Sequence, residues 1–214
     1  RNNYRQFTMI KKIKNTVVIF YIFIMVCLCF ETSAAEVNDK KSYDKVKKYL
    51  NSLQSLEANF VQVTSDGHIK KGKIYISIPG KLRISYEKPN DLLITSKGFW
   101  LVVQDRKLKQ TNNYPLHKTP LNLFLNKKLN FNDDDFKLKF EKESGIVSIE
   151  FLNNEQLIGR SFKLIFTDSP IQLKKWIITD EFDNQTSVLF QNLIIGRKYS
   201  HLLFFPEDFK EENN

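Results

Sequence analysis

Hydrophobic and polar residues follow a helical period over residues 42–56, directly before the region with strand-like patterns. Between residues 42 and 56 the apolar residues recur every three or four positions, and lysines fill the positions between them. This spacing places the apolar side chains on one face of a helix. We therefore predict an amphipathic helix over residues 42–56, with an apolar face made by Tyr43, Val46, Leu50, Leu53 and Leu56.

After this segment the period changes to two. The apolar residues that alternate with polar ones are Ile74, Ile76, Ile78, Leu82, Ile84, Tyr86, Phe136, Leu138, Phe140, Val147, Ile149, Phe151, Phe162, Leu164 and Phe166. Alternation gives a strand one apolar and one polar face, which is typical of antiparallel sheets. Turn-forming residues separate the runs at 65–67, 79–80, 97–98, 144–145, 168–170 and 183–184. The pattern predicts ten or eleven antiparallel strands joined by short turns.

One apolar segment interrupts the strands. Thr119 is a residue type that caps helices, and Pro120 suits the first helical position. We predict a short, unusually apolar helix after them, over residues 121–125. Such a helix either fills the sheet interior as core or covers an opening as a lid, and the pattern alone favours neither.

The N-terminal region has the layout of a secretory signal. Lys11, Lys12 and Lys14 precede an uncharged apolar run over residues 17–30, and small residues follow at 33–35. A basic start, an apolar run and a small-residue cleavage site predict a signal peptide over residues 1–35, cut after Ala35, with residues 1–8 upstream of a start at Met9. Residues 36–214 then form a single domain in the periplasm. The alternative is an uncleaved membrane anchor, although the run is shorter than the roughly 20 residues of a spanning helix.

Both cysteines, Cys27 and Cys29, lie within this predicted signal. The residues before them, Val26 and Leu28, are not the small residues that a bacterial lipidation site requires. We therefore expect an exported, unlipidated domain without disulfides, whose stability depends on its apolar core.

Composition and charge are those of a globular protein with a modest basic excess. Of the 214 residues 42% are hydrophobic, and the net charge is +9. The first 35 residues hold five Lys or Arg and one Glu, so the rest carries +5. Nucleic-acid-binding domains carry a denser basic stripe, so we expect no nucleic-acid partner.

No motif for catalysis, metal binding or cofactor binding is present. The chain lacks a P-loop, a Gly-x-Ser-x-Gly elbow, a His-Glu-x-x-His pair and a dinucleotide fingerprint. His68, His117 and His201 are far apart in sequence, and Asp133-Asp134-Asp135 lacks the spacing of a calcium loop. We expect a protein that is not an enzyme and that has no catalytic residue, metal site or cofactor.

An ordered set of short motifs resembles a known family. Leu56-Glu57-Ala58-Asn59-Phe60-Val61-Gln62 is followed by a Gly72-x-Ile74-x-Ile76 strand, a Pro79 step, an aromatic-rich strand that ends at Tyr86-Glu87-Lys88-Pro89, Ser96-Lys97-Gly98-Phe99-Trp100, and Thr119-Pro120-Leu121. In order and spacing this resembles the outer-membrane lipoprotein carrier protein family, LolA. The later strands and the Phe-rich segment at 202–206 fit more loosely.

The resemblance implies a fold and a function. It implies a mainly β protein with short helices, an unclosed antiparallel β-barrel of about eleven strands with a helical lid. It also implies a monomeric carrier that shields the acyl chains of acylated lipoproteins. The implied partners are an inner-membrane lipoprotein-releasing ABC transporter and an outer-membrane acceptor or the outer membrane itself. The alternatives are a periplasmic sensor or regulator on the same half-barrel, and a binder of other lipids.

We assign the candidate site from the strand residues that alternate onto the same face, together with the family resemblance. The expected acyl-chain cavity consists of Phe60, Ile74, Ile76, Ile78, Leu82, Ile84, Tyr86 and Trp100. The expected lid consists of Leu50, Leu53, Leu121, Phe124 and Leu125. Trp100 and Trp176 are expected in the rim or the wall. Ordinary core packing is the alternative for each of these residues.

At one position the chain departs from the family pattern. Ile78 stands where the family commonly has a basic residue that latches the lid, and parity places Arg83 on the outer face. We therefore expect the lid to close through apolar contacts only, with Ile78 against Leu121 or Phe124.

Overall fold

The computed structural model describes residues 39–127, 129, 131, 136–153 and 160–209. The chain divides into two units, Arg1–Ser42 and Tyr43–Asn214. In the first unit the described residues, 39–42, are helical. The predicted signal peptide and the Asp133–Asp135 run lie outside the described residues. No helix in the described ranges is long and apolar enough to cross a membrane.

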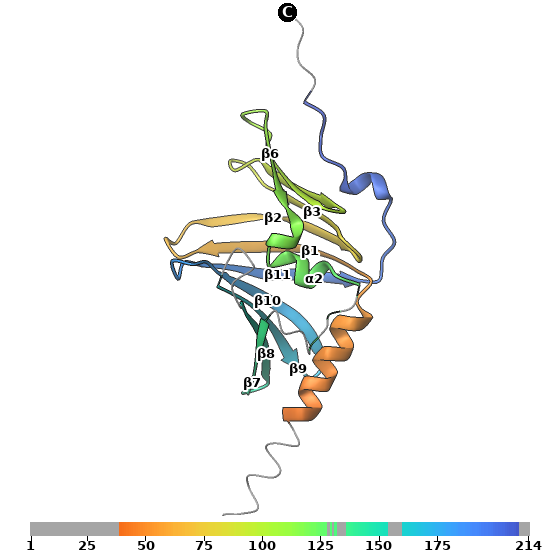
Figure 1. Ribbon diagram of the computed structural model, residues 1–214, viewed down its shortest axis with the longest axis vertical. Helices are drawn as coiled ribbons and strands as arrows, with labels where there is room; N and C mark the ends of the chain where they lie inside the picture. Colours follow the sequence, from red (N-terminus) through yellow and green to blue (C-terminus); the bar gives the residue numbers. More distant parts are fainter. Residues whose placement is uncertain (1–38, 128, 130, 132–135, 154–159, 210–214) are drawn as a thin grey trace, which may run out of the picture. The chain divides into compact units, whose positions relative to one another are not determined.

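The second unit is built on one antiparallel sheet of eleven strands (Figure 1). The strands are β1 (Ser55–Thr64), β2 (Ile69–Ser77), β3 (Lys81–Tyr86), β4 (Leu92–Lys97), β5 (Trp100–Asp105), β6 (Gln110–Pro115), β7 (Phe136–Glu143), β8 (Ile146–Asn153), β9 (Ser161–Asp168), β10 (Ile171–Thr179) and β11 (Gln185–Ile195). Their order is β6-β5-β4-β3-β2-β1-β11-β10-β9-β8-β7. Because β6 and β7 are the two edges, the sheet is not closed, as the resemblance implied.

The helices are short. An N-terminal helix runs over residues 39–52, and η1 (Leu116–Lys118) leads into α2 (Leu121–Leu125). A last turn, η2 (His201–Phe204), follows β11. The short apolar helix is thus confirmed, but its predicted cap is wrong: the Thr119 hydroxyl donates to the Leu116 carbonyl at 2.8 Å, and no side chain caps α2.

The predicted C-terminal end of the first helix is also wrong. The helix ends at residue 52, and β1 begins at Ser55. Leu56 therefore belongs to β1, where it is fully buried. A strand residue that faces the core satisfied the apolar spacing of the helix by coincidence, so the periodicity ran on past the real boundary.

The five alternating runs form β2, β3, β7, β8 and β9, and the six predicted turns fall between consecutive strands or at their ends. The total of eleven strands agrees with the prediction of ten or eleven. One face of the sheet carries the core. Its buried residues come from alternate positions on both halves of the sheet: Leu56, Ala58, Phe60, Ile74, Ile76, Leu82, Ile84, Val147, Ile149, Phe151, Phe162, Leu164, Phe166, Leu173, Trp176, Val188 and Phe190. We call this the inner face.

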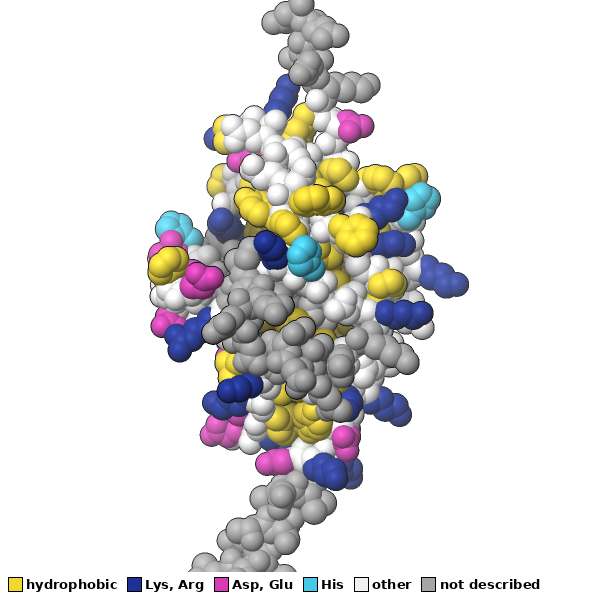
Figure 2. Space-filling model, viewed as in Figure 1, with side chains coloured by type: hydrophobic (Ala, Val, Ile, Leu, Met, Phe, Trp, Pro, Cys, Tyr) yellow, Lys and Arg dark blue, Asp and Glu magenta, His cyan; other side chains and the backbone are white. Residues whose placement is uncertain are grey.

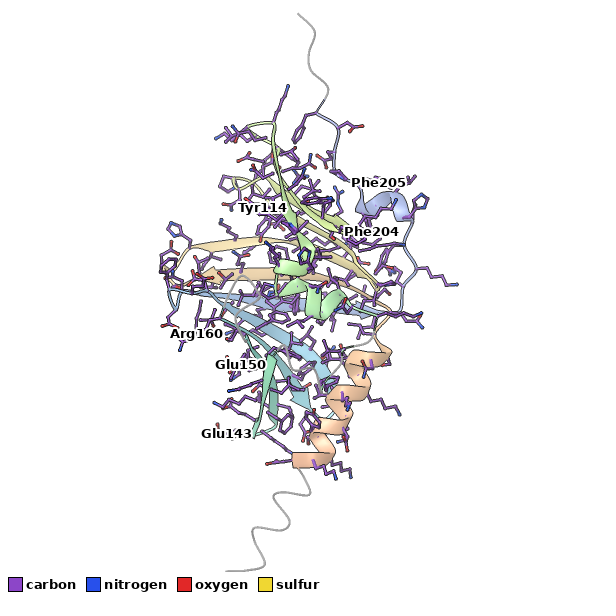
Figure 3. The ribbon with its side chains drawn as sticks, viewed as in Figure 1. Tyr114, Glu143, Glu150, Arg160, Phe204 and Phe205 are labelled. Carbon is purple, nitrogen blue, oxygen red and sulfur yellow. The ribbon has the colours of Figure 1, made fainter. Side chains whose placement is uncertain are left out.

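The C-terminal segment, residues 196–209, is held against the outer face of β3–β5. Arg83 donates to the Leu203 carbonyl at 3.3 Å. The Gln104 amide exchanges two hydrogen bonds with the backbone of Glu207, both 2.8 Å long. Phe204, labelled in Figure 3, is 1% exposed. The segment therefore covers part of the face that points away from the core.

Candidate apolar cavity under the α2 helix

Strand parity predicted the inner face of β1–β3 correctly. Phe60, Ile74, Ile76, Leu82 and Ile84 are all at most 6% exposed and belong to one apolar cluster. Each alternates with an outward residue, so the local sequence determines which side chains share the interior.

Ile78 and Tyr86 lie at the margins of this cluster. Both are partly buried and pack against it. The Tyr86 ring meets Phe60 edge to face at 5.2 Å, and its hydroxyl donates to Oε1 of Gln62 at 2.7 Å. Burial raises the pKa of Tyr86 to about 12, so the phenol is neutral at ordinary pH.

Trp100 does not line the interior, and its placement there is corrected. It is 54% exposed and pairs with Pro115 at the start of β5. Leu101, the next residue, is 8% exposed and points inward. Trp100 shares its face with Gln104, which binds the C-terminal segment on the outside. The motif that contains Trp100 was recognised, but the residue was assigned to the cavity, or to its rim or wall, without a prediction of its face in β5.

The expected lid residues all pack over the inner face. Leu50, Leu53, Leu121, Phe124 and Leu125 are each at most 9% exposed. Leu53 stands just after the first helix rather than within it. Tyr49, on the same helix, contacts Phe166 of β9 edge to face at 5.7 Å. The helix and α2 thus cover the apolar face together.

A small cavity remains between these helices and the sheet. Its lining is Leu50, Leu53, Leu123, Phe124, Asn126, Leu129, Phe151, Phe162 and Leu164. Its volume is about 10 Å³, which is about the space that one water molecule needs. In this conformation side chains fill the interior, so a long ligand enters only if α2 or its neighbours move.

A backbone hydrogen bond joins α2 to the sheet. The Gly80 amide, in the β2–β3 turn, donates to the carbonyl of Leu125, the last residue of α2, at 2.9 Å. The Ser96 hydroxyl donates to the Gly80 carbonyl at 3.2 Å. Gly80 has φ +69°, a conformation that favours glycine and directs its amide toward the helix. The expectation of an apolar closure only is therefore corrected, because a main-chain group supplies a polar contact.

Trp176, which was expected in the rim or the wall, is an interior residue that the cavity and lid sets did not include. It is 2% exposed, and its ring contacts Phe124 at 6.0 Å, Phe162 at 5.9 Å and Phe190 at 4.9 Å. Its Nε1 has no hydrogen-bond partner in the described part of the chain. Trp176 thus joins α2 to the wall formed by β9–β11. The same alternation that identified β2 and β3 marks Phe151, Phe162 and Leu164 as inward.

Charged groups gather on the outer face. Glu57, on the outer side of β1, is 6% exposed and is bound by Lys73 at 2.7 Å, Arg197 at 2.9 Å and the Tyr199 hydroxyl at 2.8 Å. The hydrogen bond from Lys73, with help from Tyr199 and Arg197 and against burial, lowers the pKa of Glu57 below its ordinary 4.5. No cluster of three or more His, Cys, Asp or Glu suited to a metal occurs among the described residues. The cavity lining contains no titratable residue.

Comparison with known proteins gives a consistent family. Residues 51–206 match the model of the outer membrane lipoprotein carrier protein LolA. An outer-membrane lipoprotein carrier protein of Methylococcus capsulatus is 27% identical over 194 residues, which cover 86% of this chain and 91% of that protein. An uncharacterised protein of Rickettsia prowazekii is 24% identical over 180 residues, 84% of this chain and 83% of its own length.

Solved structures match this chain at low identity. A LolA superfamily protein from Nitrosomonas europaea is 12% identical with a TM-score of 0.45, over 78% of this chain and 97% of that one. MucA/MucB from Pseudomonas aeruginosa matches with 12% identity and a TM-score of 0.46, over 79% of this chain and 61% of the other. Both TM-scores are below 0.5, so neither likeness bears on function.

Proposed function

Because the chain belongs to the outer membrane lipoprotein carrier protein family, LolA, we propose that it carries acylated lipoproteins through the periplasm. The acyl chains occupy the space between the inner face and α2, where they are shielded from water. The chain receives them from an inner-membrane lipoprotein-releasing ABC transporter and delivers them to the outer membrane or an acceptor there. It acts as a monomer, without a cofactor.

The observation that carries this proposal is the lid over the apolar inner face. Phe124 and Leu125 are buried against it, and the Gly80–Leu125 hydrogen bond is a contact that a small displacement of α2 breaks. A neutral hydrogen bond contributes only about 0.5–1.5 kcal/mol net to stability. Opening the lid therefore mainly costs apolar contacts, and an apolar ligand replaces these contacts when it binds.

The energetics of the cargo explain why shielding is needed. Each methylene removed from water is worth about 0.8 kcal/mol, so three acyl chains of roughly 15 methylenes represent about 36 kcal/mol. A lipoprotein does not leave a membrane unshielded against such a cost. A carrier must also release its cargo, and a lid that refills the interior when the ligand leaves favours release.

Native mass spectrometry of the chain, exported to a periplasm and purified without detergent, tests the proposal. We expect the mass of residues 36–214, and an added mass when a triacylated peptide is supplied. The same peptide without acyl chains is the control and should give no adduct. A bare peak with both peptides would contradict the carrier proposal and favour a protein-binding role. A mass that includes residues 9–35 would contradict signal cleavage alone.

A further inference from the structure

Three aromatic side chains project into solvent where β4 turns into β5 and β6 ends. Phe99 is 84% exposed, Trp100 54% and Tyr114 45%. The strand register places them at the same end of the β5–β6 hairpin, because Trp100 pairs with Pro115 and Leu101 with Tyr114; Trp100 lies on the outer face, whereas Tyr114 shares the face of Leu101. We call Phe99, Trp100 and Tyr114 the aromatic tip. Large apolar side chains exposed at one end of a sheet indicate an interaction site.

The aromatic tip lies in a strongly basic part of the chain. Residues 92–131 contain seven Lys or Arg and one acidic residue, Asp105. Arg106, Lys107 and Lys109 belong to the β5–β6 turn at the far end of β5, so the cations next to the tip are Lys97 and Lys118. Lys97 precedes the tip, and His117 and Lys118 follow it, all with exposed side chains. Asp105 is at the other end of β5, where it accepts hydrogen bonds from the amides of Lys107 and Leu108. The surroundings of the tip are therefore cationic.

The nearest carboxylates on the outer face belong to the C-terminal segment. Trp100 lines a groove with Glu207 and Asp208. Glu207 is held beside Gln104, four residues along β5 from Trp100. Its carboxylate is paired with Arg83 at 3.1 Å and Arg106 at 3.4 Å, so much of its charge is neutralised.

The aromatic tip is connected directly to the lid. The Leu116 amide donates to the Phe99 carbonyl at 2.8 Å, which fixes the start of η1 against the tip. From η1 the chain passes through Thr119 and Pro120 into α2. Figure 2 shows hydrophobic side chains gathered over β6 and η1, with His and Lys side chains beside them. A surface that binds the tip also comes close to the lid.

We propose that the aromatic tip docks on the surface of a membrane that contains anionic lipids. Tryptophan and tyrosine favour the membrane–water interface. Lysines near the surface are attracted to anionic headgroups. A neutral protein partner would use the aromatic side chains but not the surplus of cations. The purpose of docking rests on the proposed function, since it brings α2 close to the membrane that receives the acyl chains.

The chain contains a matched control for this proposal. Phe182, in the β10–β11 turn, is 84% exposed, the same fraction as Phe99. It is surrounded in sequence by Asp180, Glu181 and Asp183. An anionic surface repels this turn and attracts the tip. Phe99→Ser and Phe182→Ser therefore remove equal apolar groups from opposite electrostatic surroundings.

Co-sedimentation of the full chain with lipid vesicles tests the proposal. We expect binding to vesicles of phosphatidylglycerol and phosphatidylethanolamine, and much weaker binding to phosphatidylcholine vesicles. Phe99→Ser should weaken binding about five- to tenfold, because a large part of one aromatic side chain no longer leaves water. Phe182→Ser should stay within about twofold. Salt should weaken binding, because exposed charges are screened over about 10 Å at 0.1 M.

Fluorescence locates the contact. In a Trp176→Phe variant Trp100 is the remaining tryptophan of the chain, and its emission should shift to the blue when anionic vesicles are added. Equal weakening by Phe99→Ser and Phe182→Ser, or equal binding to anionic and neutral vesicles, would overturn the proposal. Binding only to native membranes that keep their proteins would overturn it as well and assign the tip to a protein. Adduct formation with a triacylated peptide in vesicle-free solution tests the carrier function separately, so either proposal can fail while the other stands.

Discussion

The packing of the Phe60 ring depends on the missing side chain of the glycine opposite it. It pairs with Gly72 on β2, and Gly72 in turn pairs with Tyr86 on β3. A Cβ at position 72 would lie 2.7 Å from Cζ of Phe60 and still closer to the carbonyl oxygen of Ser85. Glycine therefore makes room for the Phe60 ring, which meets Tyr86 edge to face.

Gly72→Ala should destabilise the fold by about 1–3 kcal/mol, because the added methyl group overpacks this site and must displace backbone. Urea unfolding measures the change. Gly67→Ala offers a comparison at an exposed turn, where a Cβ has no neighbour within 4 Å and only the positive φ of +81° opposes it. If the two variants lose the same stability, crowding at Phe60 is not the cause.

Glu57 makes stability depend on pH. Its partners lower its pKa in the folded state below 4.5. A carboxylate whose folded pKa is depressed stabilises the fold above its unfolded pKa, and this contribution is lost as pH falls through the folded pKa. Unfolding free energy should therefore decrease below about pH 4.5, and less steeply in Glu57→Gln. Urea titrations between about pH 3 and 7 measure both slopes. Equal slopes in the unchanged chain and in Glu57→Gln would show that Glu57 does not cause the pH dependence of stability.

At the scale of elements, α2 and the β2–β3 turn form the closure of the inner face. The sequence predicted the helix from its apolar residues and Pro120, and it predicted the turn from Pro79-Gly80. It did not predict that the Gly80 amide binds the end of α2, because 45 residues separate Gly80 from Leu125. A main-chain hydrogen bond leaves no side-chain signal in the sequence.

Phe124→Ala tests the packing of α2. Phe124 lines the small cavity and contacts Trp176, so its loss should destabilise the fold by about 3–5 kcal/mol, a typical cost of truncating a buried phenylalanine. Urea unfolding measures this loss. Phe205→Ala, at a side chain 40% exposed, is the control and should cost under about 1 kcal/mol. Similar losses in both variants would show that α2 is not packed as described.

At the scale of the whole molecule, the two tryptophans report on two separate places. Trp176 is buried on the inner face of the sheet, whereas Trp100 is exposed on its outer face. In Trp100→Phe, Trp176 is the remaining tryptophan. A triacylated peptide should change its emission, because cargo in the interior must displace Phe124 from its ring. The unacylated peptide should leave the spectrum unchanged. An adduct seen by mass without a change at Trp176 would place the acyl chains elsewhere.

The sequence by itself determined the antiparallel β architecture, the strands with clear alternation, most of the turns and the inward residues of β1–β3. These features depend on alternation and on turn chemistry, which act over a few neighbouring residues. It also determined the family, because the motifs occur in a fixed order. It did not determine the face of Trp100, since a single residue after a turn does not show on which face its strand resumes.

Only the tertiary structure decided how distant segments meet. It placed Trp176 against Phe124, joined Gly80 to Leu125, and laid the C-terminal segment across Gln104 and Arg83. It also showed that Leu56 belongs to a strand rather than to the first helix. Each of these contacts joins residues far apart in the chain, or depends on which of two local structures packs better. Periodicity specifies which face of an element is apolar, whereas the partner of that face is fixed by the packing of the whole sheet.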